Sequence, residues 1–368
     1  MTKAAVLAAV GQPLEVRTDV EVDEPHAGEV MVRMAASGVC HSDLSMQNGT
    51  MLTPTPIVLG HEGAGVIEAV GEDVTDLAVG DHVVISWVPQ CGACYYCQRG
   101  QPEICEATSM SVAMGYLLDG TTRSRSRGQA LHQMAAAGTF SERSVIPAVS
   151  AIKIPADVDL TVAALIGCGV LTGVGAALNT AQISAGDTVA VVGCGGVGLN
   201  VIQGAVLAGA GEIIAVDIHP AKLELARLFG ATAVVDAASR DPVSGVMDLT
   251  GQRGADVAFE VIGLQKTIDQ TITMTRRGGQ AVLVGVASMD AAVHVPAFFG
   301  LVLAEKTIRG CWYGSSDVRR DVPRIIDFYR QGTLKLDELI SQIIALEQVN
   351  EAFDALNAGQ VARSVIAY

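Results

Sequence analysis

Four cysteines stand close together in the first half of the chain. Cys91, Cys94, Cys97 and Cys105 follow the pattern C-x2-C-x2-C-x7-C. This spacing brings four thiolates into one short lobe, where tetrahedral coordination of a metal ion is sterically easy. An iron–sulfur cluster is the main alternative, but the sequence has no other redox-cluster motif, and a closed four-thiolate site favours zinc. We therefore predict a structural zinc that carries no chemistry, because protein ligands fill all four positions.

A second set of metal-ligand residue types is spread more widely. Cys40 opens the sequence Cys-His-Ser-Asp, His61 and Glu62 stand in a glycine-rich run, and Cys168 lies between two glycines. Two thiolates and one imidazole would leave a coordination position open, as a Lewis-acid site for an alcohol requires. Each residue is a weak signal alone, since a lone cysteine in an apolar run is more often a core residue. Together they indicate a catalytic metal site.

A third pattern has the features of a dinucleotide-binding turn. An apolar strand predicted at 188–192 runs into Gly193-Cys-Gly-Gly-Val-Gly198, which matches G-x-G-x-x-G in the required strand–turn–helix context. Its glycines let a pyrophosphate approach the N-terminus of the helix closely. Asp217 ends the next predicted strand, where a carboxylate can accept hydrogen bonds from the adenosine ribose and would repel the 2′-phosphate of NADP. The pattern favours NAD.

The elements that must position these residues change type near residue 187. Up to about residue 169, short strand-like runs split by Gly and Pro, for example at 29–33, 65–70 and 81–85, predict a mostly antiparallel β domain. A first strand is expected near the N-terminus. The segment 107–139 has weak periodicity and predicts a long loop insertion.

After Asp187 the pattern is strand–helix alternation, which predicts a doubly wound parallel sheet. The six predicted strands lie at about 188–192, 212–216, 233–235, 256–261, 280–286 and 307–311. The final segment has predicted helices at 321–331 and 346–357 and a strand at 364–368. It has no room for a core of its own and is expected to return to the first domain.

Composition excludes several classes of function. The formal net charge of −15 would repel a phosphate backbone, so no nucleic-acid partner is expected. Two uncharged stretches, 160–186 and 188–211, are long enough to cross a bilayer, but both are glycine-rich and are interpreted as buried core rather than membrane spans. Eight cysteines without an export signal indicate reduced thiols and a cytoplasmic location.

The motifs occur in the order found in the zinc-dependent medium-chain alcohol dehydrogenases, and the resemblance covers essentially the whole chain. The chain is similar in particular to bacterial members, including those related to mycothiol-dependent formaldehyde dehydrogenase, at 167–179 and 312–314. The resemblance implies an α/β protein with a GroES-like, mainly antiparallel β catalytic domain at 1–169 and 312–368. It places a Rossmann coenzyme domain with a doubly wound parallel sheet at 170–311.

The same resemblance implies an NAD-dependent enzyme with two Zn²⁺ ions per subunit. The implied ligands of the catalytic zinc are Cys40, His61 and Cys168. Glu62 is expected behind the metal, able to enter its coordination sphere, and Asp43 is expected to orient His61.

The resemblance also implies a route for the proton of the alcohol. Ser42 stands where the family uses a hydroxyl to pass this proton towards the cofactor ribose. Ser45 stands where the animal enzymes carry the histidine that ends the relay. The predicted relay therefore stops at Ser42.

Further residues are expected at the cofactor and the substrate. The implied cofactor contacts are His41, Thr172, Gly193, Gly195, Gly196, Val197, Gly198, Asp217, Lys222, Val284 and Arg363. Lys222 could instead be a solvated helix residue, and Cys194 and Cys311 are expected to be core thiols. Trp87 corresponds to an aromatic wall of the alcohol pocket, with a core tryptophan as the alternative. A bulky indole favours primary or benzylic alcohols.

Two other functions are weighed. Oxidation of a thiol adduct of formaldehyde would need an anion- or thiol-binding subsite, for which Arg123, Arg125 and Arg127 are the candidates, although solvated loop charges are the favoured interpretation. A non-catalytic zinc-binding protein on the same fold is disfavoured, as is a zinc-free quinone-reductase type, because all three catalytic ligands are present. A homodimer through edge strands near 307–311 is expected, with a homotetramer as the alternative.

Overall fold

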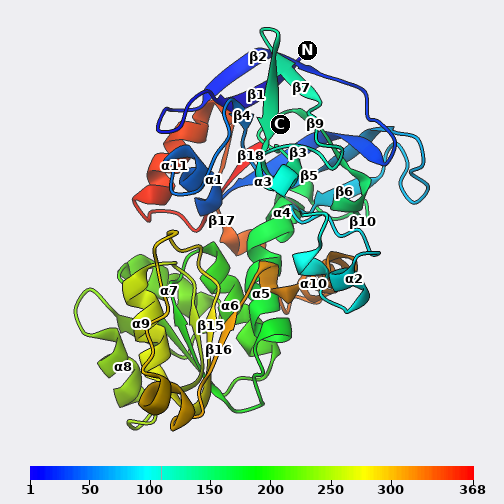
Figure 1. The fold of residues 1–368 in the computed structure, drawn as a ribbon. Helices are drawn as coiled ribbons and strands as arrows, with labels where there is room; N and C mark the ends of the chain where they lie inside the picture. The colour runs from blue at the N-terminus through cyan, green and yellow to red at the C-terminus, as the bar shows by residue number, and fades with distance from the viewer. Residues whose placement is uncertain (109) are drawn as a thin grey trace. The chain divides into compact units, whose positions relative to one another are not determined.

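The computed structural model describes residues 1–108 and 110–368, and the chain divides into two compact units (Figure 1). The first unit comprises Met1–Gly169, Asp317–Gln331 and Leu336–Tyr368. The second comprises Val170–Ser316 and Gly332–Lys335. Each unit has its own sheets and its own apolar core.

The first unit is built on two β structures. A closed barrel consists of β1 (Thr2–Leu7), β2 (Glu15–Val22), β7 (Ser124–Ser126), β8 (Gln129–Gln133) and β4 (Ile57–Val58). A 7-stranded sheet has the order β10 (Ala151–Ile154), β6 (His82–Ile85), β5 (Glu62–Val70), β3 (Glu29–Val39), β18 (Arg363–Ala367) and β17 (Ile340–Ile344), with β9 (Arg143–Pro147) paired to β3. Most of these pairs are antiparallel, as predicted, whereas β17–β18 and β4–β8 are parallel.

Short helices cover the first unit's strands. They are α1 (His41–Gln47), α2 (Tyr95–Gln98), α3 (Met110–Ala113), α4 (Leu160–Leu165), α10 (Val318–Arg330) and α11 (Val349–Asn357). The apolar face of α11, with Val349 and Phe353, packs against Leu7, Ile57 and Phe140 in one buried cluster. This cluster joins the C-terminal segment to the N-terminal strands. The same segment ends in β18, which pairs antiparallel with β3.

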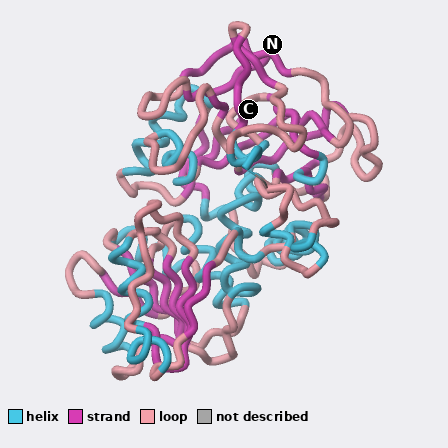
Figure 2. The backbone as a smooth tube through the Cα atoms, viewed as in Figure 1, coloured by secondary structure: helices cyan, strands magenta, loops and turns pink. Residues whose placement is uncertain are grey.

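The second unit holds a 6-stranded parallel sheet with helices beside it (Figure 2). Its order is β13 (Ala233–Asp236), β12 (Glu212–Asp217), β11 (Thr188–Val192), β14 (Ala255–Glu260), β15 (Thr275–Leu283) and β16 (Thr307–Gly310). The connecting helices are α5 (Leu171–Gly175), α6 (Gly196–Leu207), α7 (Pro220–Leu228), α8 (Pro242–Leu249) and α9 (Gln265–Met274). The strand order changes direction between β11 and β14, since β12 and β13 are added on one side of β11 and β14 to β16 on the other, which makes the carboxyl ends of β11 and β14 the expected ligand-binding edge.

All six predicted strands of this sheet are present, but β15 differs in extent. It begins at Thr275 and ends at Leu283 rather than spanning 280–286. The strand ends early because the N–H groups of Val284 and Gly285 both donate to the carbonyl of Glu260. A strand pairing with regular register would use only one of them.

The prediction of a long loop insertion at 107–139 is wrong for part of its length. The segment contains α3, β7 and β8, and only Ser109 lies outside the described residues. The hairpin turns at Arg127 and Gly128, which have φ values of 55° and 75°. Two successive positive φ values make the tight turn that suits the twist of a hairpin. An arginine is an unusual residue at such a position, so the sequence gives no clear turn signal.

The long apolar stretch after residue 159 is a core helix. Leu160–Thr180 is long and apolar enough to span a membrane, but 83% of its most apolar window is buried inside the fold. Its glycines permit close packing: a Cβ on Gly167 would lie 2.4 Å from the carbonyl oxygen of Ile85. The expected buried core is therefore confirmed here, and the backbone directly before Cys168 packs closely against β6.

Candidate metal centres and cofactor turn

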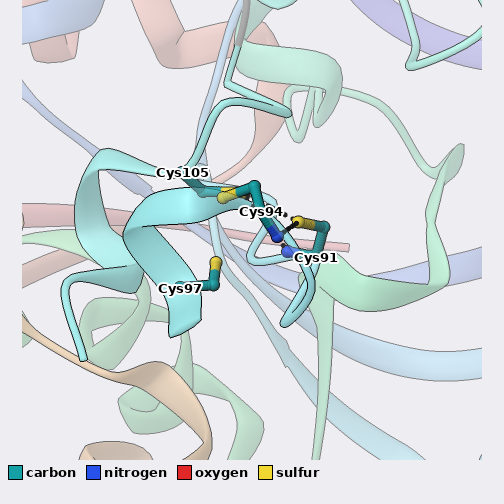
Figure 3. A group of neighbouring side chains, drawn as sticks. All are labelled: Cys91, Cys94, Cys97 and Cys105. Atoms are coloured by element: carbon teal, nitrogen blue, oxygen red, sulfur yellow. Dashed lines mark hydrogen bonds between the residues drawn. The ribbon is translucent and has the colours of Figure 1, made fainter. Parts of the chain in front are cut away.

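The four-cysteine lobe brings its sulfur atoms together as the spacing predicts (Figure 3). All four Sγ atoms lie within 4.8 Å of one another. The Sγ of Cys105 lies 3.5 Å from that of Cys91 and 3.8 Å from that of Cys94. A tetrahedral zinc with Zn–S bonds of about 2.3 Å separates its sulfurs by about 3.8 Å. The lobe therefore has the dimensions of a closed zinc site.

The backbone around the lobe favours ionised sulfurs. The N–H groups of Ala93 and Cys94 both donate to Cys91 Sγ at 3.4 Å, and that of Ala107 donates to Cys105 Sγ at 3.3 Å. Backbone donors beside it lower the pKa of Cys94 to about 6, whereas burial raises the pKa of Cys97 to about 12. Since the protein alone does not ionise all four thiols, a bound cation is the natural counter-charge.

The second cluster joins residues from three separate segments. Cys40 follows β3, His61 and Glu62 lie at the start of β5, and Cys168 follows α4. Strands β3 and β5 pair antiparallel with Gly38 opposite Glu62, which brings the first two segments together. All four side chains are buried, and their ligand atoms lie within 4.8 Å of one another. The structure thus gathers the predicted catalytic ligands at one point.

Asp43 organises this cluster, as predicted. Its Oδ1 lies 3.0 Å from His61 Nδ1 and accepts the N–H of Gly60, while its Oδ2 accepts the N–H of Cys40 at 2.9 Å. When the imidazole is neutral, the bond to Nδ1 holds the ring proton there and leaves the lone pair on Nε2. That Nε2 atom is buried without a hydrogen-bond partner among the described residues. A buried Nε2 without a hydrogen-bond partner, close to two thiols and a carboxylate, is the arrangement expected where a metal ion binds.

The titratable groups of the cluster shift one another's pKa values. A hydrogen bond between the two thiols lowers the pKa of Cys40 and raises that of Cys168. Burial opposes protonation of His61, but Asp43 and Cys40 together outweigh burial and raise the pKa of His61. Burial raises the pKa of Glu62 to about 7. These thiols and carboxyl groups are therefore poised to exchange protons when a cation binds.

One contact in this site was not predicted. Arg363 Nη2 lies 3.4 Å from Glu62 Oε1, and both side chains are buried. Gly169 makes room for it, since a Cβ there would lie 2.4 Å from Nη2. The pair depends on β18 joining β3, where Ser364 stands opposite Val39. No local sequence signal reveals that pairing, and the predicted contact of Arg363 with the cofactor stays a prediction.

The neighbours of the cluster include two predicted substrate-side residues. The Trp87 ring meets the His61 ring edge-on, with centroids 6.4 Å apart. Ser42 Oγ lies 3.9 Å from Cys40 Sγ at the start of α1, where His41 is exposed. The structure thus places Trp87 and Ser42 beside the candidate metal site.

The glycine-rich turn of the second unit has the geometry of a phosphate site. Gly193 has φ 102°, and a Cβ on Gly198 would lie only 1.8 Å from the carbonyl oxygen of Gly193. By contrast, a Cβ on Gly195, the N-cap of α6, would meet nothing within 4 Å. The helix N-terminus is therefore open to close approach by an anion.

Asp217 lies at the end of β12 beside this turn. Its carboxylate accepts the N–H of Cys194 at 2.8 Å and the N–H of His219 at 2.9 Å. These bonds hold the carboxylate at the expected ligand-binding edge of the sheet. The other predicted cofactor residues of this unit, Thr172, Val197, Lys222 and Val284, are half-buried, and their roles stay predictions. Cys194 and Cys311 are buried, as expected of core thiols.

A second carboxylate at this edge was missed. Glu260 ends β14 and is buried, and its Oε1 accepts the N–H groups of Ile262 and Gly263 and the hydroxyl of Thr267. It thereby shapes the loop after β14, beside the point where the strand order changes direction. An acidic residue ending an apolar strand, as at Asp217, was the available signal.

The arginines at 123–127 do not form an open anion site. Arg123 is 2% exposed and binds both oxygens of Glu29, at 2.9 and 2.7 Å. Arg125 is exposed and pairs with Glu21 and Asp23. The interpretation of all three as solvated loop charges is therefore wrong for Arg123. The reason is the hairpin itself, because β7 pairs with β2 and carries Arg123 into the fold.

Comparison with known proteins gives two family matches and several full-length relatives. Residues 26–156 match the alcohol dehydrogenase GroES-like domain, and residues 196–331 match the zinc-binding dehydrogenase domain. The chain is 40% identical to putative alcohol dehydrogenase D of Mycobacterium tuberculosis, with 100% of both chains covered. It is 38% identical to S-(hydroxymethyl)glutathione dehydrogenase of Synechocystis, again with 100% of both covered.

A solved structure agrees with these matches. Benzyl alcohol dehydrogenase of Acinetobacter calcoaceticus has a TM-score of 0.93 and is 31% identical, with 100% of this chain and 99% of that chain covered. The two cysteine-containing clusters and the glycine-rich turn stand within a fold shared over its whole length. The chain belongs to the zinc-dependent medium-chain alcohol dehydrogenases, a family of nicotinamide-linked oxidoreductases.

Proposed function

We propose that this enzyme oxidises a primary or benzylic alcohol to the aldehyde, reversibly, by hydride transfer to NAD. The observation that carries the proposal is the buried cluster of Cys40, His61 and Cys168, with an orphaned imidazole nitrogen and Glu62 alongside. Zinc held by these three side chains would supply Lewis acidity to the oxygen of the substrate. The four-cysteine lobe would hold the second, structural zinc.

The protein's own groups prepare the site. Asp43 holds His61 in the tautomer that presents Nε2, and through Cys40 N–H it also fixes the strand end that carries the first thiol. Glu62 belongs to the same cluster, with Arg363 as its counter-charge. We propose that Glu62 enters the metal's coordination sphere during ligand exchange. Ser42 would accept the alcohol proton and pass it on towards the cofactor ribose.

The proposal specifies NAD rather than NADP because of Asp217. A fixed carboxylate suits the two hydroxyls of the adenosine ribose and repels a 2′-phosphate. Replacing it by serine, Asp217→Ser, should lower kcat/KM for NAD by about tenfold or more and raise the NADP to NAD ratio of kcat/KM. An unchanged ratio would remove Asp217 from cofactor selection.

The substrate class rests on the aromatic wall. Trp87 lies edge-on to His61, and this contact supports a role for its indole in packing against a flat or unbranched alcohol bound at the metal. The similarity in fold to a benzyl alcohol dehydrogenase supports this class. Branched secondary alcohols should fit less well.

A second candidate is oxidation of a hydroxymethyl-thiol adduct of formaldehyde. The 38% identity to an S-(hydroxymethyl)glutathione dehydrogenase favours it. Two of the arginines considered as an anion-binding subsite for the thiol already have partners, which argues against this candidate. Arg123 is bound to Glu29, and Arg125 is bound to Glu21 and Asp23.

One substrate panel separates the two candidates. Primary, benzylic and secondary alcohols and formaldehyde, the last with and without glutathione or mycothiol, are each assayed with NAD and NADP while bound zinc is measured. Highest kcat/KM on primary or benzylic alcohols supports the proposal. Activity strictly dependent on the added thiol would establish the second candidate, and faster turnover of secondary alcohols would contradict the role of Trp87.

We also propose a cytoplasmic homodimer. All eight cysteines are free, and both metal clusters need reduced thiols, which a reducing compartment maintains. Strand β16 lies at the edge of the parallel sheet, and the turn before it exposes Phe298, Phe299 and Val302. An apolar patch beside an edge strand suits an interface between two copies, with a tetramer as the alternative.

A further inference from the structure

A tyrosine far from the metal-ligand motifs reaches the segment that packs under them. The side chain of Tyr368 is 37% exposed, and its hydroxyl donates to the carbonyl of buried Thr139 at 2.6 Å, although 229 residues separate the two. The ring lies beyond the end of β18, whose backbone pairs with β3. Tyr368 therefore fixes the position of the Thr139 backbone.

Thr139 in turn contacts both segments that carry metal ligands. Its N–H donates to the carbonyl of Gly60 at 2.9 Å, directly before His61. Its hydroxyl lies 2.6 Å from Ser37 Oγ, on the strand that ends at Cys40. Both hydroxyls are completely buried. A single residue, through its backbone N–H and its hydroxyl, thus bridges the segments that carry His61 and Cys40.

The glycines around the ligands confirm how tightly Thr139 is placed. A Cβ on Gly60 would lie 2.6 Å from Thr139 Oγ1, and one on Gly63 would lie 2.6 Å from Thr139 Cγ2. The threonine therefore fills the space beside the backbone on both sides of His61 and Glu62. Any displacement of Thr139 must move these two residues or open a void, and tightly packed interiors resist both.

We propose that Thr139, held by Tyr368 and Ser37, is the positioning element that sets the distance between Cys40 and His61 in the catalytic metal site. Neither Thr139 nor Tyr368 belongs to the ligand cluster. Tyr368 acts through the carbonyl of Thr139, and Thr139 acts through the carbonyl of Gly60 and the hydroxyl of Ser37. The inference rests on the proposed metal site but assigns residues beyond it. Removing the Tyr368 hydroxyl should loosen the ligand geometry without unfolding the protein, because the aromatic ring stays in place.

The test compares Tyr368→Phe with wild type and with Tyr329→Phe. Tyr329 donates to Asp337 Oδ2 at 2.9 Å on the surface, so its variant removes a tyrosine hydrogen bond of similar length away from the site. Cobalt is exchanged into the catalytic site, and the visible spectrum and the rate of metal loss to a chelator are recorded. Tyr368→Phe should shift the cobalt bands and speed metal loss by about tenfold, the lower end for groups that orient metal ligands.

A second variant separates an effect on ligand geometry from a loss of folding. Thr139→Val keeps the shape of the side chain but removes the hydroxyl bound to Ser37, and it should alter the cobalt spectrum in the same way, with the folded state checked by circular dichroism. Unchanged spectra and metal-loss rates in both folded variants would overturn the inference while leaving the metal site and the proposed function intact. A wild-type protein that takes up no metal at the Cys40 cluster would contradict both.

Discussion

At the scale of single residues, the proton path is the sharpest expectation. Ser42 and Ser45 lie on the same short helix, α1, but only Ser42 stands beside Cys40. Ser42→Ala should lower kcat by about 100-fold, since positioned proton transfer contributes that much or more. Ser45→Ala is the matched control and should change kcat less than threefold or so, since no relay role is assigned to it.

The check is steady-state kinetics on one primary alcohol across pH. The loss in Ser42→Ala should fall on kcat more than on KM, because the hydroxyl acts in the transition state. Equal losses in the two variants would mean that the relay does not stop at Ser42. No loss in either would place the proton path elsewhere.

Sequence reasoning succeeded at this scale wherever chemistry and local spacing coincide. The four-cysteine lobe and Asp217 after its strand follow from short motifs, and Asp43 beside His61 follows from the resemblance to the family. The pairs Arg363–Glu62 and Arg123–Glu29 could not be predicted, because their partners are far apart in the chain and meet only through strand pairing. A charged residue in isolation usually indicates a solvated surface position.

At the scale of elements, the lobe from Cys91 to Cys105 should behave as an independent metal-binding unit. Replacing one ligand, Cys97→Ser, should lower the zinc content from about two to one per chain and lower Tm, because structural zinc contributes directly to folding. The catalytic cluster shares no residue with the lobe, so its zinc should be retained.

Metal analysis of the purified variants measures this outcome. Cys311→Ser is the matched control, since Cys311 is a buried thiol outside both clusters, and it should keep both zinc ions. Loss of both ions in Cys97→Ser, or retention of both, would contradict the assignment of a separate structural site.

The β7–β8 hairpin offers a second expectation at this scale. Arg123 joins this hairpin to β3 through Glu29, and both side chains are buried. Arg123→Leu would leave the Glu29 carboxylate without its partner, which typically costs about 3–5 kcal/mol of unfolding free energy. Arg125→Leu removes an exposed ion pair and should cost less than about 1 kcal/mol.

Urea unfolding of the two variants compares them directly. A similar small loss in both would mean that Arg123 is solvated after all. The hairpin itself was not predicted from the sequence, because its tight turn has an arginine, Arg127, at a position of positive φ. Periodicity over three to five residues is too short to identify such strands, whereas the longer strands of the parallel sheet were placed within a few residues.

At the scale of the whole molecule, the order of motifs along the chain predicted both architectures. The antiparallel first half and the parallel second sheet follow from opposite patterns of hydrophobic residues. The return of the C-terminal helices and strand to the first unit followed from their small size. The pairing of β18 between β3 and β17 did not, because nothing in a short apolar strand specifies its neighbours.

The assembly of the molecule is the last expectation. The exposed side chains of Phe299 and Val302 lie just before the edge strand β16, and they are 72% and 64% exposed in the single chain. Covering such side chains in a dimer would remove apolar area from water, whereas charges there would have to be desolvated. The double variant Phe299→Glu/Val302→Glu should therefore sediment as a monomer at concentrations where the wild type is dimeric. Leu52→Glu, at an exposed apolar position of the first unit, is the control and should leave sedimentation unchanged. A wild-type monomer, or a double variant that stays dimeric, would contradict an interface at β16. Loss of the dimer with retained secondary structure would locate the contact between subunits at this edge of the parallel sheet.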